Sequence, residues 1–166
     1  MATLDPEQRA AYFALMEVSS LLHHAVEQQL RKNGGVSFVQ FQILARLSDT
    51  PEGRHRMTDL ADAVVYSRSG LTYQASLLEK WGLITRQPST EDERSVTVTI
   101  TPAGRELVDR VMPGHVAVVR AQLLEPLNKS DLTALSCVLS RVRDRMRTGP
   151  PRSAARKGRQ PQKCPS

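Results

Sequence analysis

The chain has 166 residues, of which 40% are hydrophobic and 24% are charged, as is usual for one soluble globular domain or two small ones. No apolar run approaches the roughly 20 residues of a membrane-spanning helix, and the first residues lack the order of a signal peptide, so we expect a cytoplasmic protein without a membrane partner. The formal net charge is +6, but the six basic residues after Met146 equal the whole excess. Charge alone therefore does not identify a nucleic-acid partner.

A long amphipathic helix is predicted over residues 5–32. Asp5 and Pro6 are a typical N-cap and first helical residue, and the glycines after Asn33 are typical of a helix end. Between them, apolar residues recur at spacings of three and four. They are Ala11, Leu15, Val18, Leu22, Val26 and Leu30.

Two short helices joined by a tight turn are predicted in the middle of the chain. After a helix that begins at Ser37, a short helix is expected to begin at Thr58 as its N-cap. The chain turns at Tyr66, and a further helix runs from about Ser67 to Lys80. Its expected buried stripe consists of Leu71, Ala75, Leu78 and Trp81. Two short helices around such a turn are typical of a helix-turn-helix.

A pair of strands is predicted next, at residues 83–86 and 95–100. The second alternates strictly between apolar residues and threonine, as a half-buried strand does. The connection over residues 87–94 is too long for a tight hairpin turn. The hairpin should therefore project from the helix-turn-helix as a wing.

Two helices complete the predicted fold. Thr101 and Pro102 begin a long helix that Pro113 should kink, and Ser130 is expected to cap the last helix. The composition of residues 148–166 predicts a disordered basic tail. The fold class is thus mainly α with a small β-wing, a six-helix winged helix-turn-helix in the order α-α-α-α-β-β-α-α.

The predicted domains suggest an assembly. Residues 33–101 form the winged helix-turn-helix, and the helical regions 5–32 and 102–147 lie on either side of it in sequence. A chain of this size has little else against which to bury the apolar stripes of these regions. Packing them between two copies predicts a homodimer.

Several stretches of the middle region resemble the DNA-binding core of MarR-family regulators. They are Met57-Thr58-Asp59-Leu60-Ala61, Ser67-Arg68-Ser69-Gly70-Leu71-Thr72, Leu78-Glu79-Lys80-Trp81-Gly82-Leu83-Ile84, the wing stretch Asp92-Glu93-Arg94-Ser95-Val96, and Ile100-Thr101-Pro102-Ala103-Gly104. The resemblance covers about residues 5–147. It implies a bacterial transcriptional repressor that binds a palindromic operator as a homodimer, often released by a small phenolic or other aromatic ligand. The family usually has arginine or a similar long polar residue after the recognition-helix threonine, where this chain has Tyr73 and then Gln74, so base preference does not carry over.

The candidate DNA-binding residues fall into two groups. On the recognition helix they are Ser67, Arg68, Ser69, Thr72, Tyr73, Gln74 and Ser76, with Thr58 as a helix cap at the same face; in the wing they are Arg86, Asp92, Arg94 and Ser95. A narrow minor groove attracts an inserted guanidinium, so Arg94 is expected to enter it, oriented by Asp92. The simpler interpretation is an ordinary solvated charged surface.

Three histidines are candidates for a polar spot in an effector pocket: His23, His24 and His115. Adjacent histidines on a helix point about 100° apart, so His23 and His24 do not make a metal-binding pair. We expect no metal and no cofactor. Cys137 is interpreted as a small core residue, and the sequence leaves open whether it has a redox role. With only two cysteines we expect no disulfide framework and no cysteine-based zinc site.

Three functions remain open, and none is enzymatic, because the sequence has no nucleophile elbow, paired-carboxylate motif or phosphate loop. The first is a ligand-responsive, sequence-specific regulator of double-stranded DNA, associated with the nucleoid. The second is a basic-tailed architectural DNA-binding protein without an effector. The third is a small-molecule-binding protein that has a vestigial winged helix.

Overall fold

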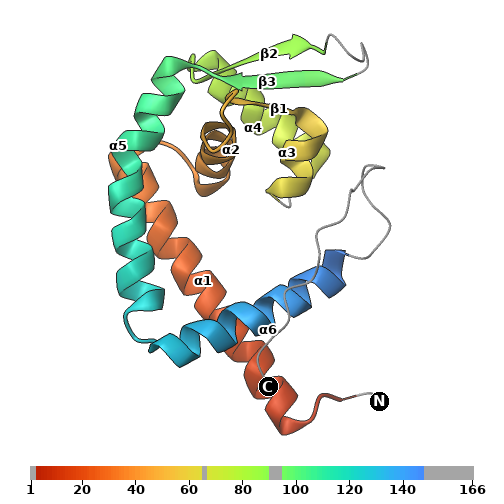
Figure 1. The fold of residues 1–166 in the computed structure, drawn as a ribbon, viewed down its shortest axis with the longest axis vertical. Coiled ribbons are helices and arrows are strands. Elements are labelled where there is room, and N and C mark those ends of the chain that lie inside the picture. The colour runs from red at the N-terminus through yellow and green to blue at the C-terminus, as the bar shows by residue number, and fades with distance from the viewer. Residues whose placement is uncertain (1–2, 65–66, 90–94, 148–166) are drawn as a thin grey trace.

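The computed structural model describes residues 3–64, 67–89 and 95–147, so the predicted disordered tail lies outside the described residues. The elements in chain order are α1 (Pro6–Gly34), α2 (Phe38–Ser48), β1 (Arg54–Arg56), α3 (Met57–Ala63), α4 (Arg68–Lys80), β2 (Ile84–Pro88), β3 (Val96–Ile100), α5 (Pro102–Val119), the π-helical segment η1 (Arg120–Leu124) and α6 (Lys129–Arg147). Six helices and a projecting hairpin confirm the predicted fold class (Figure 1). Strand β1 and segment η1 are additions to it.

Local capping explains where the first two helices begin. Asp5 accepts the Gln8 N–H at 2.8 Å, and the Gln8 side chain accepts the Asp5 N–H at 3.2 Å, which is a capping box. Ser37 begins α2 with the same reciprocal pair to Gln40. Between these helices Gly35 has a φ of 66°, a left-handed conformation that ends α1 at small steric cost.

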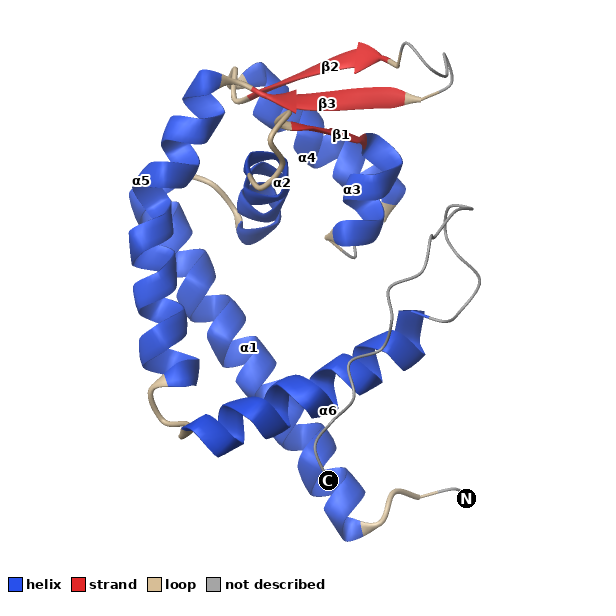
Figure 2. Ribbon diagram, in the orientation of Figure 1, coloured by secondary structure: helices blue, strands red, loops and turns tan. Residues whose placement is uncertain are grey.

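A three-stranded antiparallel sheet of order β1-β3-β2 stands at one end of the molecule (Figure 2). In the wing, Ile84 pairs with Ile100 and Pro88 pairs with Val96. Strand β1 pairs Arg54 with Thr99 on the other side of β3. Periodicity did not predict β1, because its three residues are Arg-His-Arg and show no apolar alternation.

The start of α3 differs from the prediction, because Thr58 does not cap it. Strand β1 leads directly into the helix, which places Arg56 in extended conformation at the N-cap without a side-chain cap hydrogen bond. Thr58 lies in the first turn, where its hydroxyl donates to Asp59 Oδ1 at 3.4 Å. Pairing of β1 with β3 holds the backbone up to Arg56, so the helix begins at Met57.

The last two helices also differ in detail from the prediction. Helix α5 runs through Pro113, the residue predicted to kink it, and is followed directly by the π-helical segment η1. Helix α6 begins at Lys129, and the Asn128 side-chain oxygen accepts the N–H groups of Ser130 and Asp131 at 2.8 and 3.0 Å. Asn128 therefore takes the capping role predicted for Ser130, because the helix begins one residue before that serine.

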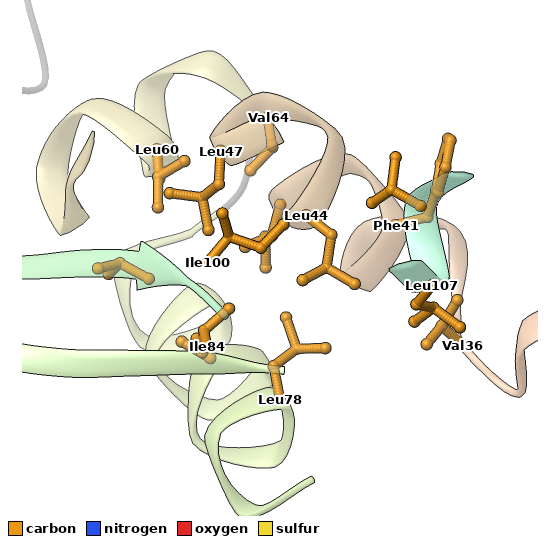
Figure 3. Close-up of a cluster of buried hydrophobic side chains, with 14 of the residues drawn as sticks. Val36, Phe41, Leu44, Leu47, Leu60, Val64, Leu78, Ile84, Ile100 and Leu107 are labelled. Carbon is orange, nitrogen blue, oxygen red and sulfur yellow. The ribbon is translucent and has the colours of Figure 1, made fainter. Parts of the chain in front are cut away.

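One apolar core joins the winged unit to the C-terminal part of α1 and the first half of α5 (Figure 3). Its fully buried large side chains are Leu30, Val36, Ile43, Leu44, Leu47, Leu60, Leu71, Leu78, Ile84, Val98 and Val111. Trp81, predicted to continue the buried stripe of α4, is instead 48% exposed. Helix α4 ends at Lys80, so Trp81 lies at its C-cap and outside the stripe.

The other parts of the long helices lie outside this core. Helices α1 and α5 run side by side away from the winged unit (Figure 1). In α1 the buried residues are Val26 and Leu30, both near its C-terminal end, and within Lys129–Arg147 no residue of α6 is buried. Across the described ranges, no helix combines the length and apolarity that crossing a membrane requires.

Candidate nucleic-acid interface

Helix α4 presents a polar face to solvent. Ser67 caps it by accepting the Gly70 N–H at 3.2 Å, and Leu71, Ala75 and Leu78 fix the opposite face in the core. The predicted recognition residues Ser67, Ser69, Thr72 and Tyr73 are exposed on it. The backbone of Arg68 belongs to α4, and its side chain lies outside the described part. The helix thus carries a face that can enter a major groove.

Two other recognition candidates are engaged within the protein. The Gln74 side chain is half-buried, and its Oε1 accepts a hydrogen bond from Nε2 of the buried Gln40 at 2.9 Å. The Ser76 hydroxyl donates to the Thr72 carbonyl at 2.9 Å. Gln74 therefore lies on the flank of α4 that faces α2, beside the exposed face.

Arg86, predicted as a DNA-binding residue of the wing, forms an ion pair with Glu79 of α4 through two guanidinium nitrogens. Its Nε and Nη2 donate to Glu79 Oε2 at 2.9 and 2.6 Å, and its backbone N–H donates to Glu79 Oε1 at 3.0 Å. The hydrogen bond from the Arg86 side chain is the main cause that lowers the pKa of Glu79. Both carboxylate oxygens thus tie the base of strand β2 to the recognition helix, an arrangement that positions the wing.

The rest of the wing is described only in part. Asp92 and Arg94 lie outside the described residues. Ser95 is half-buried, and its carbonyl accepts the Ser89 N–H at 2.8 Å, which extends the hairpin beyond the paired residues. Val96 is 39% exposed although it alternates with buried residues, because this part of β3 projects beyond the core.

Of the three candidate effector histidines, two line one groove and the third does not. His23 packs edge-on against Phe38 with ring centroids 5.1 Å apart, and His24 lies 2.9 Å from the Gln28 amide nitrogen. His115 packs instead against Phe41, at 4.8 Å. An open groove of about 510 Å³ is lined by Ser19, Ser20, His23, His24 and Glu27, and His115 is not part of it.

His115 is a half-buried titratable group at the junction of α5 and α2. Its Nδ1 is buried without a hydrogen-bond partner, and burial lowers the pKa of the ring. In the described ranges no cluster of His, Cys, Asp and Glu could hold a metal ion. The prediction that Cys137 is a core residue is wrong: it is half-buried on α6, a helix in which no residue is fully buried.

Three residues that position the interface are not among the predicted site residues: Glu79, Gln40 and Glu27. A Glu27 carboxylate oxygen accepts the Phe38 N–H at the start of α2, and the other pairs with Arg31 at 2.9 Å. The Ser-x-x-Gln pattern of a capping box could have identified Gln40. The pairings of Glu79 and Glu27 need the tertiary structure, because each joins a helix to a separate element.

Comparison with known proteins agrees with this geometry. A family model described as "MarR family" matches residues 34–95. The regulator PecS of Dickeya dadantii is 31% identical over 84% of this chain and 83% of its own. The chain belongs to the MarR family. Two crystal structures from Streptomyces coelicolor are similar to it. AbsC has a TM-score of 0.84 and 32% sequence identity, and the match covers 90% of this chain and 100% of AbsC. Sco3205, solved in complex with DNA, has a TM-score of 0.83 and 28% identity, and the match covers 87% of this chain and 90% of Sco3205.

Membership of the MarR family fixes the class of function. The family and these relatives are transcriptional regulators, so this MarR-family chain is a DNA-binding transcriptional regulator and not an enzyme. Its winged helix-turn-helix is the part that the family model matches. The polar face of α4 and the hairpin β2–β3 are accordingly its candidate DNA-reading elements.

Single substitutions of Glu79 and of Arg86 test whether Arg86 positions the wing. If it does, both Glu79→Gln and Arg86→Ala should weaken binding to DNA several-fold and lower stability by about 1 kcal/mol, because each removes the same ion pair. If Arg86 binds phosphate directly, Glu79→Gln should strengthen binding, because it removes a negative charge near DNA. Fluorescence anisotropy with a fixed duplex and thermal melting measure both effects, and tighter binding of Glu79→Gln would contradict the positioning role.

The lowered pKa of His115 predicts a pH-dependent stability. In the unfolded chain a histidine has a pKa near about 6.5, so below that pH the unfolded state binds more protons than the folded state. Stability should be highest above about pH 6.5 and fall as the pH drops toward the folded-state pKa. The melting temperature at fixed protein concentration should therefore fall less between about pH 7.5 and 5.5 for His115→Gln than for the unchanged chain. An equal fall in melting temperature for both proteins would show that His115 does not contribute to the pH dependence of stability.

Proposed function

We propose that the chain acts as a homodimer that represses transcription from a palindromic operator and is released by a small aromatic or phenolic molecule. The observation that carries the proposal is the apolar surface of the long helices. On α1 the exposed large side chains are Tyr12, Phe13, Leu15, Met16, Val18 and Leu21; on α5, η1 and α6 they are Val116, Leu124, Leu132, Val138, Leu139, Val142 and Met146. Soluble monomers rarely expose so much contiguous apolar surface.

A two-fold dimer buries this surface and also makes the interface symmetric. The regions 5–32 and 102–147 supply the dimerisation helices, and residues 33–101 supply the DNA-binding unit. Two α4 helices related by the axis would meet successive major grooves about 34 Å apart. A dimer of this kind favours a palindromic site, because each copy reads one half with the same residues.

The proposed contacts to double-stranded DNA follow the polar face of α4 and the wing. The relative Sco3205 was solved with DNA, which supports this partner. Arg68, Ser69, Thr72 and Tyr73 would meet phosphates and base edges of the major groove. In the wing, Arg94 would enter the minor groove, oriented by Asp92. Occupation of an operator within a promoter would block polymerase, which is the basis of the proposed repression.

The groove at His23 and His24 is the proposed effector site. It offers imidazole and hydroxyl groups beside Phe38, which suits an aromatic ring with polar substituents. Glu27 lines this groove and also accepts the Phe38 N–H at the start of α2. A molecule that displaces Glu27 would act on α2 and, through it, on the recognition helix packed against α2.

Selection of bound duplexes from a random pool tests this function, and Phe13→Glu tests the dimer. Phe13 is 60% exposed on α1, so a charge there should block burial between copies and leave the monomer folded. The variant should sediment as a monomer at micromolar concentration and bind the selected palindrome at least about tenfold more weakly, with unchanged affinity for a half-site.

Trp81→Glu is the matched control, because Trp81 is 48% exposed at the end of α4 and lies beside the start of α5, whereas the exposed large apolar side chains of α5 begin at Val116. It should remain dimeric. A dimeric Phe13→Glu variant would contradict the proposed interface. Equal affinities of the unchanged chain for selected and random duplexes would instead favour the architectural alternative.

A further inference from the structure

We propose that Gln40, buried in α2, fixes the orientation of the Gln74 amide on the recognition helix, so that Gln74 offers the DNA hydrogen-bond donors while its acceptor oxygen faces α2. This inference rests on the proposed function, in which α4 enters the major groove. It assigns a positioning role to Gln40, which itself lies away from the polar face of α4. The ligand chemistry it predicts is a hydrogen-bond acceptor on DNA.

The orientation begins with a backbone group that can only donate. The Ser37 N–H donates to Gln40 Oε1 at 2.8 Å, as part of the capping box of α2. A backbone N–H has no acceptor capacity, so the oxygen of the Gln40 amide must face Ser37. Gln40 is only 4% exposed, which leaves its amide nitrogen on the opposite side, inside the protein.

The Gln40 amide determines the orientation of the Gln74 side-chain amide in the same way. Gln40 Nε2 lies 2.9 Å from Gln74 Oε1 and can only donate to it. The oxygen of Gln74 must therefore face α2, and its nitrogen must point away. Within the described residues no hydrogen bond is made by Gln74 Nε2, and this atom is not among the buried side-chain atoms without a partner. Water reaches it at the flank of α4.

This orientation limits what Gln74 can read. A freely rotating glutamine binds adenine in a bidentate manner, because its oxygen accepts from N6 while its nitrogen donates to N7. With its oxygen turned toward α2, Gln74 can donate to N7 or O6 of guanine, to O4 of thymine or to a phosphate oxygen. It cannot accept from the amino group of cytosine. The neighbouring Tyr73 is 63% exposed, so Gln74 lies at the border between the exposed face of α4 and its buried face.

Gln40→Glu reverses the orientation without touching the DNA surface. A glutamate at the third position of a capping box still accepts the Ser37 N–H, but it presents an oxygen to Gln74. The Gln74 amide should then turn over, with its nitrogen toward Glu and its oxygen outward. In duplex selection, the preference at one symmetric pair of operator positions should change from guanine or thymine to cytosine or adenine, by about tenfold in relative affinity.

Two further variants separate this effect from a structural one. Gln74→Ala should lose the preference at that position, and the double variant Gln40→Glu/Gln74→Ala should show the same preference as Gln74→Ala alone. Gln40→Met, which removes the donor and keeps the size, should broaden the preference to include adenine if Gln40→Glu fails to fold. If Gln74 contacts only phosphate, Gln40→Glu should weaken binding to every DNA sequence by a similar factor. In a chain that already carries Gln74→Ala, Gln40→Glu should then not change the affinity.

The outcomes are distinguishable from failure of the proposed function. If the unchanged chain selects no palindrome, the proposed function fails. If it selects one and Gln74→Ala binds every variant of that palindrome as the unchanged chain does, the inference is overturned and the function stands. A change of preference in Gln40→Glu that persists in the double variant would also overturn it, because the change would not pass through Gln74.

Discussion

Helix α2 packs against α1, α3, α4, α5 and the sheet, and its burial is the constraint on which the DNA-binding unit depends. Ile43, Leu44 and Leu47 are fully enclosed, so this helix cannot shift without opening the core. Its first turn is also held by polar contacts, from Glu27 of α1 and through Gln40 to the recognition helix. The position of α4 relative to the long helices is therefore set largely through α2.

The same core leaves the long helices incomplete. Burial ends near the last two turns of α1 and the first half of α5, and α6 contributes nothing to it. The winged unit thus shares one enclosed core with the end of α1 and the first half of α5, while the remaining parts of the helices expose apolar side chains that a single copy cannot cover. This division agrees with the proposed roles, a rigid reading unit joined to an assembly surface, with the groove at His23 on α1 close to the start of α2.

Periodicity and capping predicted the six helices and the wing, because both signals are local. Ser37 and Ser67 cap the helices that they were expected to begin. Strand β1 was missed because it forms only by pairing with β3, and the same pairing moved the start of α3 away from Thr58. Side-chain partners were the least predictable: Arg86 pairs with Glu79 across two elements, and His23 and His115 pack on different phenylalanines. Such contacts depend on tertiary distances that spacing in the sequence does not contain.

The central claim is that two copies hold their recognition helices at one fixed separation. Binding to operators in which the spacer between the half-sites is lengthened by single base pairs tests it most directly. A rigid dimer should show a sharp optimum, and an insertion of about five base pairs, half a helical turn, should reduce the affinity to that of a single half-site. Affinity that does not change with spacing would contradict the account, because it would mean that the winged units bind independently.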